Sequence, residues 1–143
     1  MMTIASALAA LCNMLRAKTG VEVILGRPDD AVAGIYVWPW RLWESPDLRN
    51  LPEPIGPATD SSHQAAAPNV DFLVLVRPAL TVDGLTRLSE ARQAMLDNPL
   101  LNVDGTAAHL ALSPIPADLL SSIFSAGSIP LTVCLSATLR GSG

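Results

Sequence analysis

The side chains that could carry chemistry are few in this sequence and lie far apart. His63 and His109 are the only histidines, and Cys12 and Cys134 are the only cysteines. A catalytic or metal site would need a partner close to one of them, as in HExxH or CxxC, and neither pattern occurs. GxSxG and a glycine-rich phosphate loop are also missing. We therefore predict no catalytic residue, no metal ligand and no cofactor, and we expect a protein that is not an enzyme.

The unusual side chains that remain are aromatic. Trp38, Trp40 and Trp43 are the three tryptophans of the chain, and they fall within six residues around Arg41. Because Trp and Arg are enriched at the energetic centres of interfaces, we predict that these four residues and Arg49 form an oligomer or partner interface. The alternative is a core anchor with one edge stacked on Arg41, and the sequence leaves both open.

The composition also suggests contact with other protein. Hydrophobic residues make up 50% of the 143 residues and charged residues 15%, whereas an average domain has roughly 25% charged residues. One folded copy would struggle to hide this much apolar surface, so neighbouring chains are expected to cover part of it. An Ala- and Pro-rich loop that inflates the count is the alternative.

Charge and hydropathy exclude two kinds of partner. The net charge is −4 and there is no basic run, so we expect no nucleic-acid binding. No apolar stretch reaches about 18 residues, so no membrane span is predicted. The apolar N-terminus lacks preceding basic residues and is interpreted as a mature helix. Two isolated cysteines are typical of reduced thiols in a cytoplasmic protein.

Hydrophobic periodicity predicts the elements that must position these side chains. The expected helices cover residues 3–18, 84–96 and 116–124, and the expected strands cover 21–25, 34–40, 70–76, about 108–112 and 130–139. Gly20 should end the first helix, and Asp83 should cap the second. Pro39 cannot donate to a ladder, so its strand should end there or lie at a sheet edge. Residues 70–76 should form the central strand.

This order of elements predicts an α+β fold. We expect one domain over residues 1–143, with two layers, a mixed β-sheet and about three helices packed on one side. A long loop at about 41–69 contains five prolines and no sustained period. Its 56–68 part has no clear apolar pattern.

Several stretches follow, in order, the pattern of a known family. They are IASALAALCNMLR, AGIYVWPWRLWESPDLRNL, VDFLVLVRPAL, GLTRLSEARQAMLDNPLLN and LALSPIPADLLSSIFSAGSIPLTVCLSATLRG. On these stretches the chain resembles the tail cap, or tail terminator, family of contractile injection systems, over most of its length except 56–68. Phe124 stands where the family usually has tryptophan, and the 70–76 strand lacks the usual His-Tyr pair.

The resemblance implies a structural role. Such a protein forms a ring, expected to be a hexamer, that closes the distal end of the tube and sheath of a contractile injection system or phage-like tail. Its partners would be copies of itself and the tube and sheath proteins, first in the cytoplasm and then in the particle. Two alternatives stay open: a monomeric adaptor that holds a peptide or small apolar ligand at Trp38–Trp43, and an enzyme with an unrecognised site.

Overall fold

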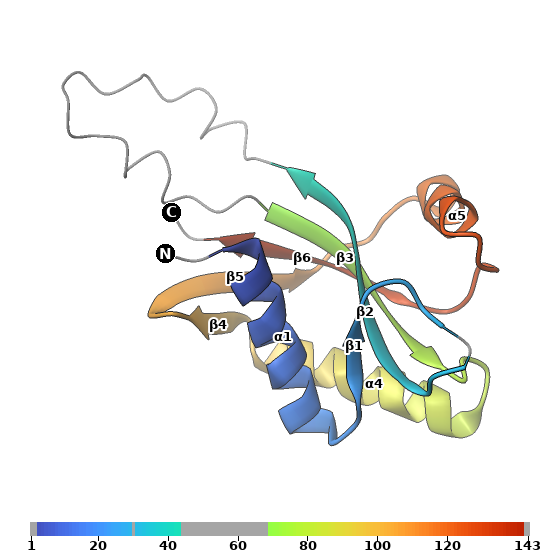
Figure 1. The fold of residues 1–143 in the computed structure, drawn as a ribbon, viewed down its shortest axis with the longest axis horizontal. Helices are drawn as coiled ribbons and strands as arrows, with labels where there is room; N and C mark the ends of the chain where they lie inside the picture. Colours follow the sequence, from blue (N-terminus) through green and yellow to red (C-terminus); the bar gives the residue numbers. More distant parts are fainter. Residues whose placement is uncertain (1–2, 30, 44–68, 142–143) are drawn as a thin grey trace.

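A six-stranded mixed sheet organises the part of the chain that the computed structural model describes, residues 3–29, 31–43 and 69–141 (Figure 1). Its elements are α1 (Ile4–Thr19), β1 (Val23–Leu25), β2 (Gly34–Trp43), β3 (Asn69–Arg77), α4 (Val82–Asp97), β4 (Leu100–Val103), β5 (Thr106–Leu112), α5 (Ala117–Ala126) and β6 (Leu135–Gly141). The strand order is β1-β2-β3-β6-β5-β4, with β1 and β2 parallel and the other pairs antiparallel. The predicted α+β class with a mixed sheet is confirmed, and β3 is a central strand as expected.

Helices α1 and α4 cover one face of the sheet. Their apolar stripes pack on alternate residues of β2 and β3, such as Ile35, Val37, Phe72 and Val74, which are all fully buried. Burial of a large aliphatic or aromatic side chain contributes about 1.5–3 kcal/mol, so this layer supplies most of the stability. The remaining buried residues of the layer are Ala7, Leu8, Leu11, Cys12, Leu15, Val23, Val70, Val76, Leu88, Ala91, Ala94, Met95, Leu101, Val103, Ala108, Leu110, Ala137 and Leu139.

The third helix, α5, packs against residues that point to the opposite face. Tyr36, Leu73 and Leu75 alternate with the residues of the first layer and form a second cluster with Phe124 of α5. The Tyr36 hydroxyl lies 2.7 Å from the carbonyl oxygen of Val32, which satisfies its polar end. The two predicted long helices therefore make the helical layer, while α5 supports only part of the other face.

The helix ends differ in one respect from the prediction. Gly20 ends α1 in the left-handed conformation, with φ of 70°, as expected. The cap of α4 is Thr81, whose hydroxyl accepts a hydrogen bond of 2.9 Å from the backbone N–H of Gly84. The prediction that Asp83 is the cap is wrong. Asp83 lies in the first turn instead, where its carboxylate is 3.2 Å from Arg87.

A hairpin that the prediction missed joins β4 and β5. Asp104 and Gly105 both have positive φ, 52° and 81°, and Val103 pairs with Thr106 around them. A two-residue Asp-Gly turn of this kind matches the twist of the flanking strands. The signal was present in the sequence, and it adds β4 to the sheet edge.

Two strands have ends other than those predicted. β2 continues to Trp43 and β3 begins at Asn69, so residues 41–43 and 69 are not loop; the rest of the predicted loop, 44–68, lies outside the described residues. β6 begins at Leu135 rather than at residue 130, because the stretch before it has no strand to pair with among the described residues. Leu131 in that stretch is 58% exposed. No helix in the described ranges has the length and apolar character needed to cross a membrane.

Candidate interface site

The tryptophan-rich segment occupies the half of β2 that lies beyond β1. β1 pairs only with Ile35–Val37, whereas β3 pairs along the whole of β2. From Trp38 onward the other edge of β2 therefore has no partner strand in the described part of the chain. Pro39, which has no N–H to donate, lies on this open stretch. Of the two options for Pro39, the edge position is the one observed.

A β-bulge turns the end of β2 toward the face that carries α5. Pro39 pairs with Phe72 and Arg41 pairs with Asp71, so Trp40 is the extra residue in the ladder. Without the bulge, the alternation of side chains would direct Arg41 toward α1 and α4. With the bulge, Trp40, Arg41 and Trp43 all project on the same side of the sheet as Asp71.

Trp38 is a packing residue between β2 and α5. Its ring meets Phe124 edge to face, with centroids 5.7 Å apart and planes at 85°. A Cβ atom added at Gly127 would lie 2.5 Å from the Trp38 ring, so the indole fits closely against the end of α5. Trp38 therefore follows the core alternative, and it is partly buried rather than free for a partner.

The other two tryptophans form a stack with two arginines. The Arg41 guanidinium lies 5.1 Å from the ring centroid of Trp40 and 5.6 Å from that of Trp43. Arg140 of β6, which is far from Trp43 in the sequence, has its guanidinium 5.9 Å from the Trp43 ring centroid. These distances allow cation–π attraction between the arginines and the rings. We call Trp40, Arg41, Trp43 and Arg140 the arginine–tryptophan cluster.

A buried carboxylate fixes one arginine of this cluster. Asp71 accepts from Arg41 at 2.7 Å and 2.6 Å, and its other oxygen accepts from the Thr138 hydroxyl at 2.7 Å. The Thr138 hydroxyl is in turn 3.1 Å from that of Ser113. The Asp71 side chain is 7% exposed, whereas that of Arg41 is 54% exposed. The cluster therefore rests on a satisfied polar network and presents part of its surface to solvent.

The structure brings together three of the five predicted interface residues. Trp40, Arg41 and Trp43 are adjacent, Trp38 packs on α5 instead, and Arg49 lies outside the described residues. Sequence reasoning missed Asp71 and Arg140, because nothing near them in the chain indicates that they meet β2. The assignment of this segment as an interface stays a prediction.

The histidines and cysteines do not form a common site in the described ranges. His63 lies outside these ranges, and His109 is an exposed residue that pairs with Arg140 across β5 and β6. No group of three or more potential metal ligands occurs among the described residues. Burial raises the pKa of the Cys12 thiol against a weaker opposing effect of Arg16, and burial alone raises that of Cys134. Both thiols are therefore poor nucleophiles near neutral pH.

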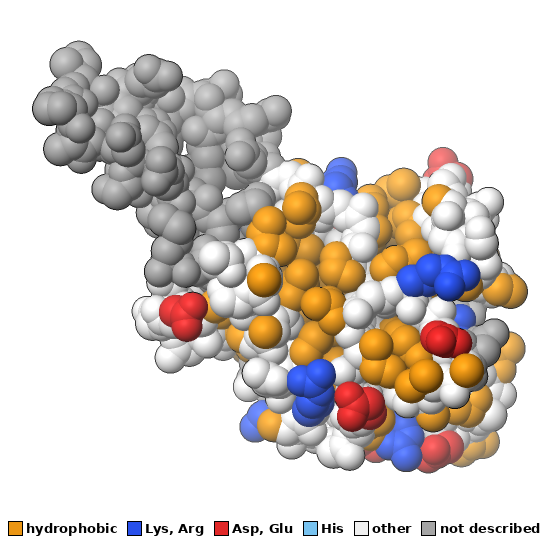
Figure 2. Space-filling model, in the orientation of Figure 1, with side chains coloured by type: hydrophobic (Ala, Val, Ile, Leu, Met, Phe, Trp, Pro, Cys, Tyr) orange, Lys and Arg blue, Asp and Glu red, His pale blue; other side chains and the backbone are white. Residues whose placement is uncertain are grey.

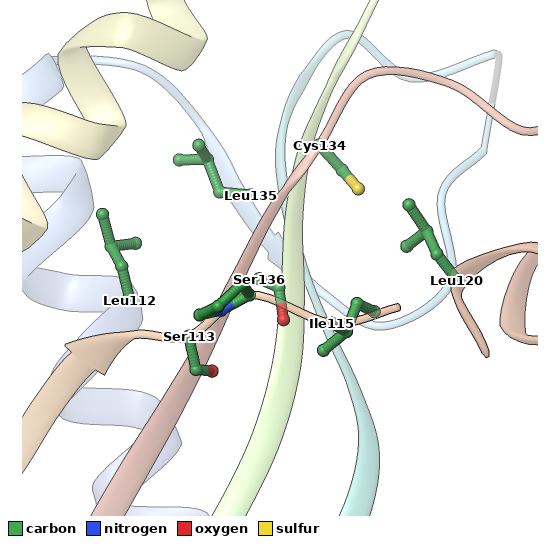
Figure 3. Close-up of a pocket in the computed structure, with 8 residues that line it drawn as sticks. Leu112, Ser113, Ile115, Leu120, Cys134, Leu135 and Ser136 are labelled. Carbon is green, nitrogen blue, oxygen red and sulfur yellow. The ribbon is translucent and has the colours of Figure 1, made fainter. Parts of the chain in front are cut away.

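A pocket of about 340 Å³ lies between α5 and the start of β6 (Figure 3). Leucine, isoleucine and proline side chains make most of its wall, and Cys134 and Ser136 come from the β6 side. The Ser136 hydroxyl is buried without a hydrogen-bond partner among the described residues. The full lining is Leu112, Ser113, Pro114, Ile115, Leu120, Cys134, Leu135 and Ser136. The tryptophans take no part in this lining, so this pocket is not the ligand site that the adaptor alternative expects.

Apolar side chains also gather on the surface, as Figure 2 shows for one face of the molecule. Leu80 and Val82, at the start of α4, are 80% and 85% exposed. Leu42 at the open edge of β2 is 55% exposed, and Leu100 on the outermost strand β4 is 57% exposed. Scattered apolar residues are normal on a monomer, but their occurrence at both sheet edges agrees with a chain that has protein neighbours.

Comparison with known proteins identifies structures with the same fold. No family model matches the chain, and no curated protein matches it. The sheath/tube terminator of the PVC extracellular contractile injection system, in its extended state, superposes with a TM-score of 0.71 at 14% identity, over 99% of this chain and 56% of that one. The tube terminating cap of the anti-feeding prophage superposes with a TM-score of 0.69 at 20% identity, over 98% of this chain and 54% of that one.

The two comparisons define the class of fold. This chain has the fold of tube terminators of contractile injection systems and spans about half the length of the two terminators. The resemblance to the tail terminator family that the sequence indicated is confirmed at the level of the fold.

Proposed function

We propose that this chain is a structural subunit that closes the distal end of the tube and sheath of a contractile injection system or phage-like tail. The observation that carries this proposal is its fold likeness, over 98% or more of the chain, to two proteins that terminate such tubes. The role is one of binding rather than catalysis, which suits a chain in which we predict no catalytic residue.

A ring of identical subunits is the assembly that fits this role. Ring closure requires two different surfaces on each subunit, because head-to-tail contacts generate a cycle when the rotation closes. The open edge of β2 and the arginine–tryptophan cluster offer one such surface, with Trp40, Arg41 and Trp43 as contact residues. Arg49 and Trp38 complete the interface predicted from sequence, and Trp38, which packs on α5 on the same face of the sheet, would contribute by holding β2 in place. Six subunits are expected from the family resemblance.

The remaining partners follow from the same role. The ring would contact the last layer of tube protein and the end of the sheath, and it would join them in the cytoplasm before the particle is released. Neither nucleic acid nor membrane is required for this assembly.

Electron microscopy and native mass spectrometry test the proposal directly. The purified chain should form a closed ring with cyclic symmetry, and six subunits are expected. When tube and sheath proteins of the same injection system are added, density for the ring should appear at one end of the assembled tubes. A chain that stays monomeric at high concentration and never appears at tube ends would contradict the proposal. Tryptophan fluorescence that changes with an added peptide, and not with protein concentration, would favour the adaptor alternative.

A further inference from the structure

The sheet has a free edge on each side in the part of the chain that the structure describes. β4 is the outermost strand on one side, and on the other side β2 extends past the short strand β1 (Figure 1). β4 contains neither a charged residue nor a proline, two of the features that usually keep a free edge from pairing. Both edges also carry an exposed leucine, Leu42 on β2 and Leu100 on β4. Each edge is therefore open to a further strand.

On β2, the main-chain groups that point out of the sheet beyond β1 belong to Pro39 and Leu42. Val37 marks this edge, because its carbonyl accepts a hydrogen bond of 2.8 Å from the N–H of Gly26, just after β1. Main-chain direction alternates along a strand, and the bulge adds one residue at Trp40, so the next outward residues are Pro39 and Leu42. Pro39 offers only a carbonyl. Leu42 is therefore the residue that offers both an N–H and a carbonyl.

On β4, the outward main-chain groups belong to Leu100 and Asn102. The carbonyl of Pro99 points the other way, toward β5, where it accepts a hydrogen bond of 2.8 Å from the N–H of Leu110. Leu101, two residues further along, faces β5 as well and is paired with it. The residues on either side of Leu101 therefore each leave an N–H and a carbonyl for a neighbouring strand.

The two free edges match in direction. Each step from β2 through β3, β6 and β5 to β4 joins antiparallel strands, so the direction reverses four times and β4 runs parallel to β2. A copy rotated about a ring axis can therefore place its β4 beside β2 of its neighbour without turning its sheet over. Helices α1 and α4 of both copies then stay on the same side of the joined sheet.

The faces of the sheet determine the register of such a pair. Leu42 is paired with Val70, which is buried in the layer under α1 and α4, and Leu101 is buried in the same layer. Opposite residues of a sheet project on the same face, so Leu42 would lie opposite Leu101. In a parallel pair the N–H of Leu42 then donates to the carbonyl of Leu100, and the carbonyl of Leu42 accepts from the N–H of Asn102. Both main-chain groups of Leu42 find a partner in this register.

We propose that β4 of one copy pairs in parallel with the open stretch of β2 on a second copy, with Leu101 opposite Leu42. The occupant is a second copy because the chain itself supplies, for each free edge, a strand of matching direction, face and hydrogen-bonding groups. Main-chain hydrogen bonds provide the attraction, as in other cases of strand addition. The contact joins two different edges, so it is head-to-tail and can close a ring. The inference rests on the proposed function and adds the second surface that a ring requires.

Proline substitutions test the pairing, because they remove an outward N–H and leave the ladder inside each copy intact. Leu42→Pro and Asn102→Pro should each raise the concentration at which half of the chain is assembled by about tenfold or more, measured by native mass spectrometry. Leu42→Ala and Asn102→Ala are the matched controls, because they remove the same side chains but keep the N–H. The Asn102 control matters because its side chain accepts a hydrogen bond of 3.0 Å from the N–H of Gly105, which both variants lose.

A mixing experiment tests whether the two edges join different copies. Neither Leu42→Pro nor Asn102→Pro should associate alone, because each lacks one of the two edges. A mixture should give heterodimers and no rings, because the intact β4 of the first variant pairs with the intact β2 of the second. Circular dichroism and the unfolding midpoint verify that both variants are folded. In assembled wild-type protein, hydrogen exchange should slow at the amides of Leu42 and Asn102.

Three outcomes would overturn the inference. The proline variants could assemble as well as their alanine controls. Leu42→Pro alone could form dimers, which would show that β4 pairs with itself, or the mixture could fail to give heterodimers. If both proline variants form wild-type rings, the inference fails while the ring proposal stands. If the wild-type chain never assembles or caps tubes, the proposed function fails, and the inference fails with it.

Discussion

The contrast between Trp38 and Trp43 gives the sharpest prediction. Both indoles belong to one strand, yet Trp38 packs edge to face on Phe124 of α5, whereas the Trp43 ring centroid lies 5.6 Å from the guanidinium of Arg41 and 5.9 Å from that of Arg140. We expect Trp38→Ala to lower the stability of the monomer, and Trp43→Ala to lower assembly more than stability.

The magnitudes follow from the contacts of each ring. Loss of a core aromatic side chain costs about 3–5 kcal/mol of unfolding free energy, and because Trp38 is only partly buried we take the low end, about 3 kcal/mol. Trp43 loses two cation–π contacts worth about 0.5–1 kcal/mol each, so its truncation should cost about 1–2 kcal/mol. The Arg41–Asp71 pair remains in that variant.

Urea unfolding followed by far-ultraviolet circular dichroism, below the concentration at which the chain assembles, measures the stability. Native mass spectrometry of the folded fraction measures assembly, which Trp43→Ala should weaken by about tenfold or more if Trp43 is an interface anchor. Trp→Phe at each position serves as a matched control for ring size. The reasoning is refuted if Trp43→Ala destabilises the monomer more than Trp38→Ala does while its folded fraction assembles normally.

Three further predictions concern residues around the site. Arg41→Ala should lower the unfolding free energy by about 2–3 kcal/mol, because the buried carboxylate of Asp71 then lacks its charge partner. Asp71→Asn should lower it by only about 1–2 kcal/mol, because the Arg41 side chain is 54% exposed and water can solvate its charge. Urea unfolding should show this order, and the reverse order would contradict the reasoning. Gly127→Ala should lower the unfolding free energy by about 1–3 kcal/mol, since the new methyl group meets the Trp38 ring, and the loss should largely disappear in a Trp38→Ala background. Burial raises the pKa of the Cys134 thiol, so the midpoint of the rise with pH in its rate of reaction with a disulfide reagent should lie above about 8.5, the midpoint of an exposed cysteine; a midpoint at or below that pH would contradict the effect of burial.

The bulge in β2 places the Arg41 side chain beside Asp71. Without the extra residue at Trp40, Arg41 would face the apolar helical layer, and the Asp71 carboxylate would lose its charge partner. The cost of burying an unpaired carboxylate is far larger than that of one disrupted ladder position, so the register shift is the favourable solution. The same shift exposes part of the arginine–tryptophan cluster on one face.

Signals carried by neighbouring residues determined much of the fold from the sequence alone. The apolar stripe of α1, its end at Gly20 and the uninterrupted β3 depend on signals within a few residues, and each was predicted correctly. The Asp104-Gly105 hairpin belongs to the same class, since its turn signal was local although it was missed.

The tertiary structure alone decided where strands end and which polar groups are buried. Leu131 alternates with its neighbours as a strand residue would, yet β6 begins only at Leu135, because a strand requires a partner at hydrogen-bonding distance. Asp71 appears as one polar residue within an apolar stretch, and only Arg41 and Thr138, brought from distant parts of the chain, make its burial affordable. Backbone propensity acts over a few residues, whereas pairing and burial depend on which segments meet in space, and no local pattern contains that information.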